Sequence, residues 1–220
     1  MGIKSNIENL RASLPSYVKL AAVSKTRPIE DILEAYQCGQ RIFAENKAQE
    51  LAQKHNLLPL DIEWHLIGHL QTNKVKYIAP FVRLIHSIDS LKLLEAINKE
   101  AIKNDRIINY MFQIHIAKEE TKFGLSFSEL EIILNCEEFN SLSNVCLVGL
   151  MGMATYTDDT GLIRSEFLEM KTYFDLIKKR YYSNKPEFCE LSIGMSSDYQ
   201  IAVEEGSTMV RIGSSIFGNR

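Results

Sequence analysis

Leu20-Ala-Ala-Val-Ser24 opens the first of a series of strand-and-helix units. This short apolar run predicts a buried strand. Pro28 fits the first turn of a helix after it, and Gly39 stands just beyond the expected end of that helix. Residues 20–39 therefore predict a strand, a loop and a helix in succession, which is the unit from which parallel sheets are built.

Seven further runs of this kind follow along the 220 residues, and amphipathic stretches separate them. The eight predicted strands are residues 20–24, 41–43, 62–67, 83–87, 108–116, 145–150, 188–193 and 209–212. An open doubly wound sheet more often uses fewer strands, so we expect a (β/α)8 TIM barrel of the α/β class. No linker or break in composition divides the chain, which predicts a single domain over residues 1–220.

Two stretches of sequence have the apolar spacing of amphipathic helices. Ile3, Ile7, Leu10 and Leu14 predict an extra N-terminal helix that covers the outside or the bottom of the barrel. The longest predicted helix carries one apolar stripe, which we interpret as core packing. Its members are Ile163, Phe167, Met170, Phe174, Ile177 and Tyr181.

Composition and charge exclude several classes of protein. Hydrophobic residues make up 45% and charged residues 24%, which is typical of a soluble globular protein rather than a disordered one. The net charge of -3 and the lack of a long basic run argue against nucleic acid as a partner. We find no signal peptide and no apolar run long enough to span a membrane, so we expect a cytoplasmic protein. The four cysteines lack metal-site spacing and predict buried thiols in a reducing compartment.

Lys25 is the first candidate for chemistry, because barrels bind ligands where strands end and the following loops begin. An amine at that position can form a Schiff base if burial lowers its pKa. Most lysines, however, are solvated surface residues, and this alternative stays open on position alone.

Small residues after the last two strands predict a phosphate site. Gly213 and Ser214 follow strand 209–212, and Ser196 follows strand 188–193 with a hydroxyl that can donate to the same anion. The alternative is a turn followed by a helix cap, and Ser197 with Gln200 resembles such a cap, as Ser126 with Glu129 does in an earlier loop.

Arg211 is polar on an otherwise apolar strand, and alternation places it on the face opposite Val210 and Ile212. A guanidinium inside a barrel needs a partner, which is either a carboxylate or a ring nitrogen of a cofactor. Asn46 fits a helix N-cap and a ligand contact equally well.

Three further residue types do not predict a site. His65 and His69 have the spacing of a metal pair on a helix, but they lie in a predicted strand and turn, so we expect no metal site. Trp64 and Met151 are interpreted as packing residues.

Six segments together resemble the YggS/PROSC family of pyridoxal phosphate (PLP) homeostasis proteins, in order and over nearly the whole chain. They are Ala-Val-Ser-Lys-Thr-Arg-Pro (22–28), Ala-Glu-Asn-Lys-Ala-Gln-Glu (44–50), Trp-His-Leu-Ile-Gly-His-Leu-Gln-Thr-Asn-Lys (64–74), Gly-Leu-Met-Gly-Met-Ala (149–154), Ser-Ile-Gly-Met-Ser-Ser-Asp (192–198) and Val-Arg-Ile-Gly-Ser-Ser-Ile-Phe-Gly (210–218).

This resemblance implies a fold similar to the N-terminal barrel of alanine racemase, with PLP bound as an aldimine. By position it implies that Lys25 is the Schiff-base lysine and that Arg211 faces the pyridine nitrogen. It also implies that Ser196, Gly213 and Ser214 bind the phosphate and that Asn46 lies near the cofactor. The sequence departs from the family at Ala44, where glycine is usual, and at Phe123 in Lys122-Phe-Gly124, where a small residue is usual.

The resemblance favours a protein that buffers or delivers PLP with little or no catalysis, and hence no catalytic residue. Alanine racemases use a second base from an additional domain, and 220 residues leave little room for one. The alternatives are a single-domain PLP-dependent amino-acid racemase and, less favoured, a barrel enzyme that acts on a phosphorylated sugar through Lys25. We expect a monomer, with apo PLP-dependent enzymes as recipients and neither nucleic acid nor a membrane as a partner.

Overall fold

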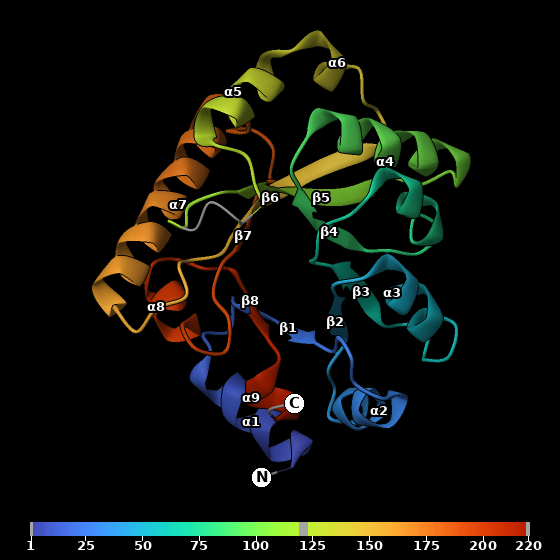
Figure 1. Cartoon of the computed structure of the whole chain (residues 1–220), viewed down its shortest axis with the longest axis vertical. Coiled ribbons are helices and arrows are strands. Elements are labelled where there is room, and N and C mark those ends of the chain that lie inside the picture. Colours follow the sequence, from blue (N-terminus) through green and yellow to red (C-terminus); the bar gives the residue numbers. More distant parts are fainter. Residues whose placement is uncertain (1, 119–122, 219–220) are drawn as a thin grey trace.

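Eight parallel strands form a closed barrel in the computed structural model, which describes residues 2–118 and 123–218 (Figure 1). Each strand pairs with the next along the chain, and the last pairs with the first. The strands are β1 (Lys19–Val23), β2 (Ile42–Glu45), β3 (Glu63–Leu66), β4 (Leu84–Ile88), β5 (Ile108–Ile114), β6 (Val145–Gly152), β7 (Glu190–Ser192) and β8 (Met209–Ile212). This confirms the predicted (β/α)8 barrel, and each predicted strand overlaps an observed one.

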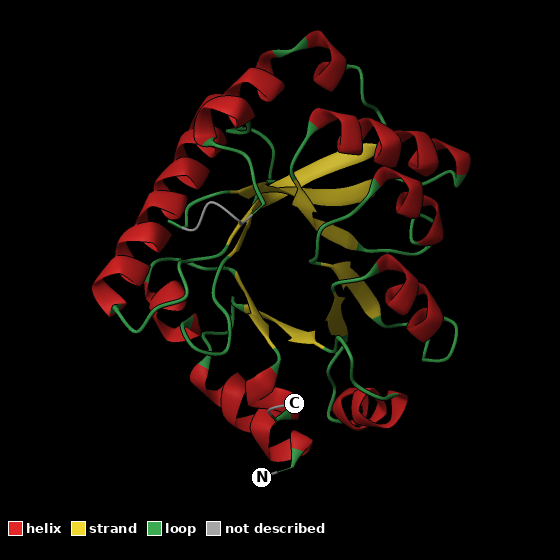
Figure 2. Cartoon of the chain, in the orientation of Figure 1, coloured by secondary structure: helices red, strands yellow, loops and turns green. Residues whose placement is uncertain are grey.

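Helices surround the strands (Figure 2). They are α1 (Ile3–Ser13), α2 (Ile29–Gln37), α3 (Ala48–His55), the 3-10 helix η1 (Thr72–Tyr77), α4 (Leu91–Lys103), α5 (Phe127–Asn135), α6 (Glu137–Asn140), α7 (Thr160–Tyr181), α8 (Tyr199–Glu204) and α9 (Ser214–Phe217). The predicted N-terminal helix is confirmed as α1, which buries Ile7 and Leu10 and packs against α2 and α9. The predicted apolar stripe is confirmed on α7.

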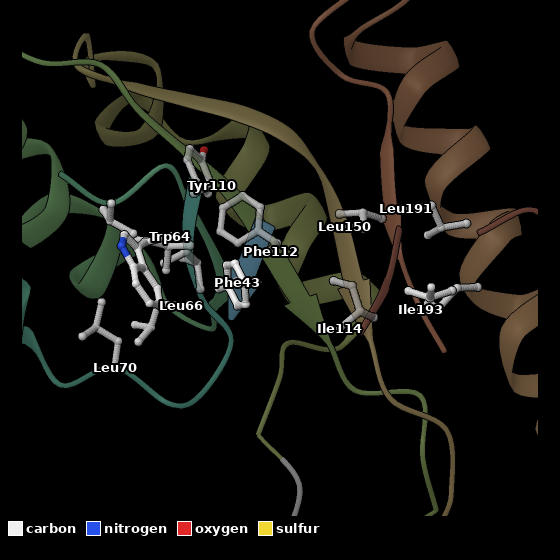
Figure 3. Close-up of a cluster of buried hydrophobic side chains, with 14 of the residues drawn as sticks. Phe43, Trp64, Leu66, Leu70, Tyr110, Phe112, Ile114, Leu150, Leu191 and Ile193 are labelled. Atoms are coloured by element: carbon white, nitrogen blue, oxygen red, sulfur yellow. The ribbon is translucent and has the colours of Figure 1, made fainter. Parts of the chain in front are cut away.

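Side chains alternate between two cores along the strands, as parallel barrels require, apart from irregularities in β4 and β6. The larger core lies between the strands and the helices, and Figure 3 shows Phe43, Trp64 and Phe112 within it. A smaller core fills the barrel interior and includes Ala44 and Met151. Trp64 and Met151 are both buried, which confirms them as packing residues.

The predicted helix ends have mixed outcomes. Ser126 and Glu129 form the predicted capping box at the start of α5. Pro28 is the N-cap of α2, so the prediction that it lies in the first turn is wrong by one residue. Ser197 is not a cap, because α8 begins at Tyr199 and Asp198 is the N-cap residue. The Asp198 carboxylate accepts the Met195 N–H at 2.6 Å instead of a helix N–H.

The four cysteines are free thiols, but the prediction that they are buried is wrong. Cys189 is exposed, and Cys38, Cys136 and Cys146 are half-buried. All four lie at or near the ends of helices and strands, where side chains are closer to solvent than in the middle of an element. Within residues 2–118 and 123–218, no helix combines the length and apolarity needed to cross a bilayer.

Candidate functional site

The predicted site residues lie at the carboxyl ends of four neighbouring strands. Strands β7, β8, β1 and β2 are consecutive in the closed barrel. The residues are Lys25 after β1, Asn46 after β2, Ser196 after β7, and Arg211, Gly213 and Ser214 within or directly after β8. The carboxyl end of a barrel is where ligand sites form, so the topology brings the six predicted residues to one rim.

Lys25 is half-buried in the loop between β1 and α2. The loop begins as a continuation of the sheet, with the Ser24 N–H donating to Ala44 O at 3.0 Å. It turns through Thr26, which has a φ of 63°. Arg27 then donates to Gly218 O and lies over the Phe217 ring. The loop that carries Lys25 is thereby tied to the segment that follows β8.

Three hydrogen-bonding groups meet beside this loop. The N–H groups of Gly213 and Ser215 donate to Ser196 Oγ at 3.3 and 3.5 Å. Gly213 also lies against β1, and a Cβ at that position would be 3.3 Å from Val23 O. Ser214 is exposed as the first residue of α9. The two N–H groups and the Ser196 hydroxyl therefore converge next to the β1 end, and an anion that displaced the two long contacts to Ser196 Oγ would accept from all three.

Arg211 is buried inside the barrel, as its alternation with Val210 and Ile212 predicts. Its Nη1 donates to Ser192 O at 2.6 Å and to Ser192 Oγ at 2.7 Å, and its Nη2 donates to Gly152 O at 2.9 Å. Burial lowers the pKa of the Arg211 guanidinium to about 10, against the attraction of Asp198. The side chain therefore stays protonated at neutral pH, and neutral oxygens hold its orientation.

A chain of buried polar side chains continues from Arg211 through the barrel. Ser192 Oγ lies 3.0 Å from His86 Nδ1, and His86 Nε2 lies 3.0 Å from His65 Nδ1. Burial lowers the pKa of His65 to about 3 and that of His86 well below its ordinary value, so both rings are neutral. We call His65, His86, Ser192 and Arg211 the interior chain.

Asn46 is half-buried at the end of β2 and does not cap α3. The helix begins at Ala48, so Lys47 occupies the N-cap position and Asn46 lies one residue too early. This excludes one of the two predicted roles. Its backbone packs closely on the next loop, since a Cβ on Gly68 would be 2.3 Å from Asn46 O. Only glycine fits at that contact.

The two departures from the family pattern lie in different surroundings. Ala44 is fully buried in the interior core and faces neither solvent nor a helix. Phe123 is more than half exposed and stacks on His69, with ring centroids 4.2 Å apart. Lys122 lies outside the described residues. Across the part of the chain that the structure describes, no group of His, Cys, Asp or Glu could hold a metal ion.

Sequence reasoning placed Arg211 inside the barrel but missed its partners His65, His86 and Ser192, and it missed Ser215. His65 stands between two apolar neighbours on β3, and the parity argument that found Arg211 would have placed it, and Ser192 on β7, inside the barrel. His86 is followed by Ser87, and the register shift between Ile85 and Ile88 breaks the alternation on β4, so the same argument does not place it. Ser215 contributes a backbone N–H, which side-chain identity does not reveal.

Comparisons with known proteins identify the family of this chain. The family model described as "Alanine racemase, N-terminal domain" matches residues 2–220. A pyridoxal phosphate homeostasis protein from Aquifex aeolicus is 40% identical over 92% of this chain and 87% of its own length. The corresponding protein from Pasteurella multocida is 37% identical over 99% of this chain and 94% of its own.

Solved structures show the same fold. PipY from Synechococcus elongatus PCC7942, with PLP bound, is 34% identical and has a TM-score of 0.88, covering 98% of this chain and all of that one. Alanine racemase from Bartonella henselae is 15% identical with a TM-score of 0.73, and the match covers 99% of this chain and 58% of the racemase. The chain therefore belongs to the family of pyridoxal phosphate homeostasis proteins, with the fold of the alanine racemase N-terminal domain.

Proposed function

We propose that this protein binds PLP through Lys25 and buffers or delivers it, with little or no catalysis of its own. One observation carries the proposal: an amine, a group of anion donors and a buried guanidinium share the rim formed by β7, β8, β1 and β2. The names of the relatives and the PLP-bound PipY structure support it.

The donor set fits the chemistry of PLP. Ser196 Oγ and the N–H groups of Gly213 and Ser215 would hold the phosphate, because an anion accepts from all three. Arg211 would donate to the ring nitrogen, and Asn46 would line the cofactor on the β2 side. When bound, PLP would supply an aldehyde with which the Lys25 amine could form a Schiff base, with the two amine protons and the aldehyde oxygen leaving as water.

Arg211 also limits the chemistry of the site. A guanidinium donates a hydrogen bond and keeps its proton, so it cannot protonate a ring nitrogen as a carboxylic acid would. The hydrogen bonds to Ser192 and Gly152 hold the guanidinium in one orientation, which supports this role. A ring held this way is a weak electron sink, which disfavours transamination and decarboxylation and favours storage of the cofactor.

The proposal extends to the setting of the protein. We take residues 1–220 as one PLP-binding domain that acts as a cytoplasmic monomer and passes PLP to apo PLP-dependent enzymes. The match of one family model to residues 2–220 supports the single domain. Transfer is testable by mixing the PLP-loaded protein with an apo-transaminase and measuring recovered activity against an equal amount of free PLP.

Two measurements test the binding and the lack of catalysis. Adding PLP to the apoprotein should give a visible absorption band that shifts with pH, and the band should be missing in Lys25→Ala. Amino acids incubated with the loaded protein in deuterium oxide should keep their Cα protons. Fast exchange at Cα would overturn the non-catalytic part of the proposal and favour a single-domain racemase.

A further inference from the structure

A buried charged cluster lies behind the Lys25 loop, on the helix side of the barrel wall. Lys54 of α3 forms ion pairs with Glu45 of β2 at 2.8 Å and with Glu50 of α3 at 2.7 Å. The Glu45 side chain is fully buried and the Lys54 side chain is 8% exposed. We call Glu45, Glu50 and Lys54 the Lys54 cluster.

The Lys54 cluster holds the peptide groups on both sides of Lys25. Lys54 Nζ donates to Ser24 O at 2.7 Å, directly before Lys25. Glu50 Oε1 accepts the Thr26 N–H at 2.6 Å, directly after it. Ser24 Oγ also donates to Glu45 Oε1 at 2.6 Å. Two contacts thus hold the peptide groups on either side of Lys25, and a third holds the side chain of the preceding residue.

The backbone held in this way is strained. Thr26 has a φ of 63°, in the left-handed region that a β-branched residue rarely adopts. Such a conformation persists only where surrounding contacts impose it. The Glu50 carboxylate supplies one of these contacts, because it accepts the N–H of the strained residue itself. Without that acceptor, the turn at Thr26 can relax and carry Lys25 with it.

The Lys54 cluster contributes little net stability to the fold, because burying its charges carries a large desolvation penalty. It gathers two carboxylates around one ammonium group, and Glu45 Oε2 is buried without a hydrogen-bond partner among the described residues. Burial raises the pKa of Glu45 to about 6, although Lys54 and Ser24 donate to it. Well-packed apolar residues usually stabilise a core as well as a buried ion pair does. The charges therefore point to a role in geometry.

We propose that Glu45, Glu50 and Lys54 are positioning residues that fix the peptide groups on either side of Lys25 and so aim its amine at the cofactor. The inference rests on the proposed PLP binding through Lys25. Lys54 binds the chain where it leaves β1, and Glu50 binds it just after Lys25. The Lys25 Cα is therefore held in place, and this limits the positions that the side-chain amine can reach.

Glu50 offers the sharpest test, because its side chain is 23% exposed and its replacement leaves the buried Lys54–Glu45 pair in place. Glu50→Ala removes the acceptor for the Thr26 N–H, whereas Glu50→Gln keeps an oxygen there. We expect Glu50→Ala to weaken PLP binding about tenfold. We also expect it to move the pH midpoint of the absorption band, and Glu50→Gln to restore most of both.

Lys171→Met is the matched control, because it removes the lysine of another i,i+4 ion pair, on α7. Its PLP affinity and pH midpoint should equal those of the unchanged protein. Urea unfolding of the apoproteins shows whether Glu50→Ala remains folded, and Lys54→Arg, which keeps the charge, provides a second variant. Lys54→Arg should bind PLP more weakly, since a guanidinium cannot reproduce the three contacts of the ammonium group.

The outcomes separate the two proposals. The positioning role is overturned if Glu50→Ala binds PLP with unchanged affinity and pH midpoint while Lys25 of the unchanged protein carries the cofactor. It is also overturned if Glu50→Gln is as impaired as Glu50→Ala, because the acceptor oxygen would then be irrelevant. If the unchanged protein forms no adduct at Lys25, the proposed function itself fails.

Discussion

The Lys54 cluster and the interior chain are both buried and polar, but they lie on opposite sides of the barrel wall and hold different parts of the chain in place. The Lys54 cluster is charged and holds main-chain groups around Lys25. The interior chain has one charge, on Arg211, and uses neutral imidazoles and a hydroxyl to hold a side chain. Holding a strained backbone segment calls for strong, charge-assisted hydrogen bonds, whereas orienting a guanidinium needs only matched acceptors.

This difference in charge predicts a difference in stability. Breaking a buried ion pair leaves an uncompensated charge, whereas breaking a neutral hydrogen bond leaves an unpaired polar atom. Substitutions in the Lys54 cluster should therefore lower the free energy of unfolding more than substitutions in the interior chain do. The single tryptophan, Trp64, is buried on β3, which makes its fluorescence a common probe for unfolding of both sets of variants.

The largest effect is expected for Lys54→Met. Removing the ammonium leaves the fully buried Glu45 carboxylate without its counter-charge, which should lower the free energy of unfolding by about 3–5 kcal/mol. Urea unfolding followed by Trp64 fluorescence measures the loss. The double variant Lys54→Met with Glu45→Leu should recover most of it. A loss below about 1 kcal/mol in the single variant would show that the pair is not desolvated as the structure has it.

The two regions should also respond to pH with opposite sign. The pKa of Glu45 is about 6 in the folded protein, above its ordinary 4.5, so the native state binds more protons between those values. Its contribution to stability therefore falls by about 1 kcal/mol as the pH rises from 4.5 to 6, and by about 2 kcal/mol over the whole range from well below 4.5 to well above 6. The pKa of His65 is lowered from 6.5 to about 3, so the native state binds fewer protons in that window. Its contribution falls by about 3 kcal/mol as the pH drops from 6.5 to 4.

Unfolding curves from pH 4 to 7 separate these contributions. Glu45→Gln should lose stability more steeply on acidification between pH 6 and 4.5 than the unchanged protein does, because the opposing carboxylate is gone. His65→Leu should lose it less steeply. Parallel curves for all three proteins would contradict the assigned pKa shifts.

A smaller effect is expected for His86→Leu. It removes the contacts with His65 and Ser192 but leaves Arg211 bonded to Ser192 and Gly152, so stability should fall by about 1–3 kcal/mol. PLP affinity should change little, because the guanidinium keeps its partners. Lys171→Met, which removes a single surface ion pair on α7, is the control and should stay within about 0.5 kcal/mol of the unchanged protein. If His86→Leu lowered the free energy of unfolding as much as Lys54→Met does, the predicted difference in stability between the interior chain and the Lys54 cluster would be wrong.

Sequence patterns predict the barrel and, of the two buried polar groups, only the position of Arg211 in the interior chain. The apolar runs specify all eight strands, and alternation places Arg211 inside the barrel. Helix starts are less predictable, because a shift of one residue moved the cap from Asn46 to Lys47. The Lys54 cluster could not be predicted, since it depends on β2, α3 and the Lys25 loop meeting in three dimensions. Nothing local distinguishes Lys54 from a solvated lysine on α3.

The central claim is that Lys25 carries the cofactor, and reductive trapping tests it most directly. The protein is incubated with PLP, reduced with borohydride, digested and analysed by mass spectrometry. The account predicts a phosphopyridoxyl group on the peptide that contains Lys25, and its loss in Lys25→Ala. A label on another lysine, or one that Lys25→Ala retains in full, would contradict it.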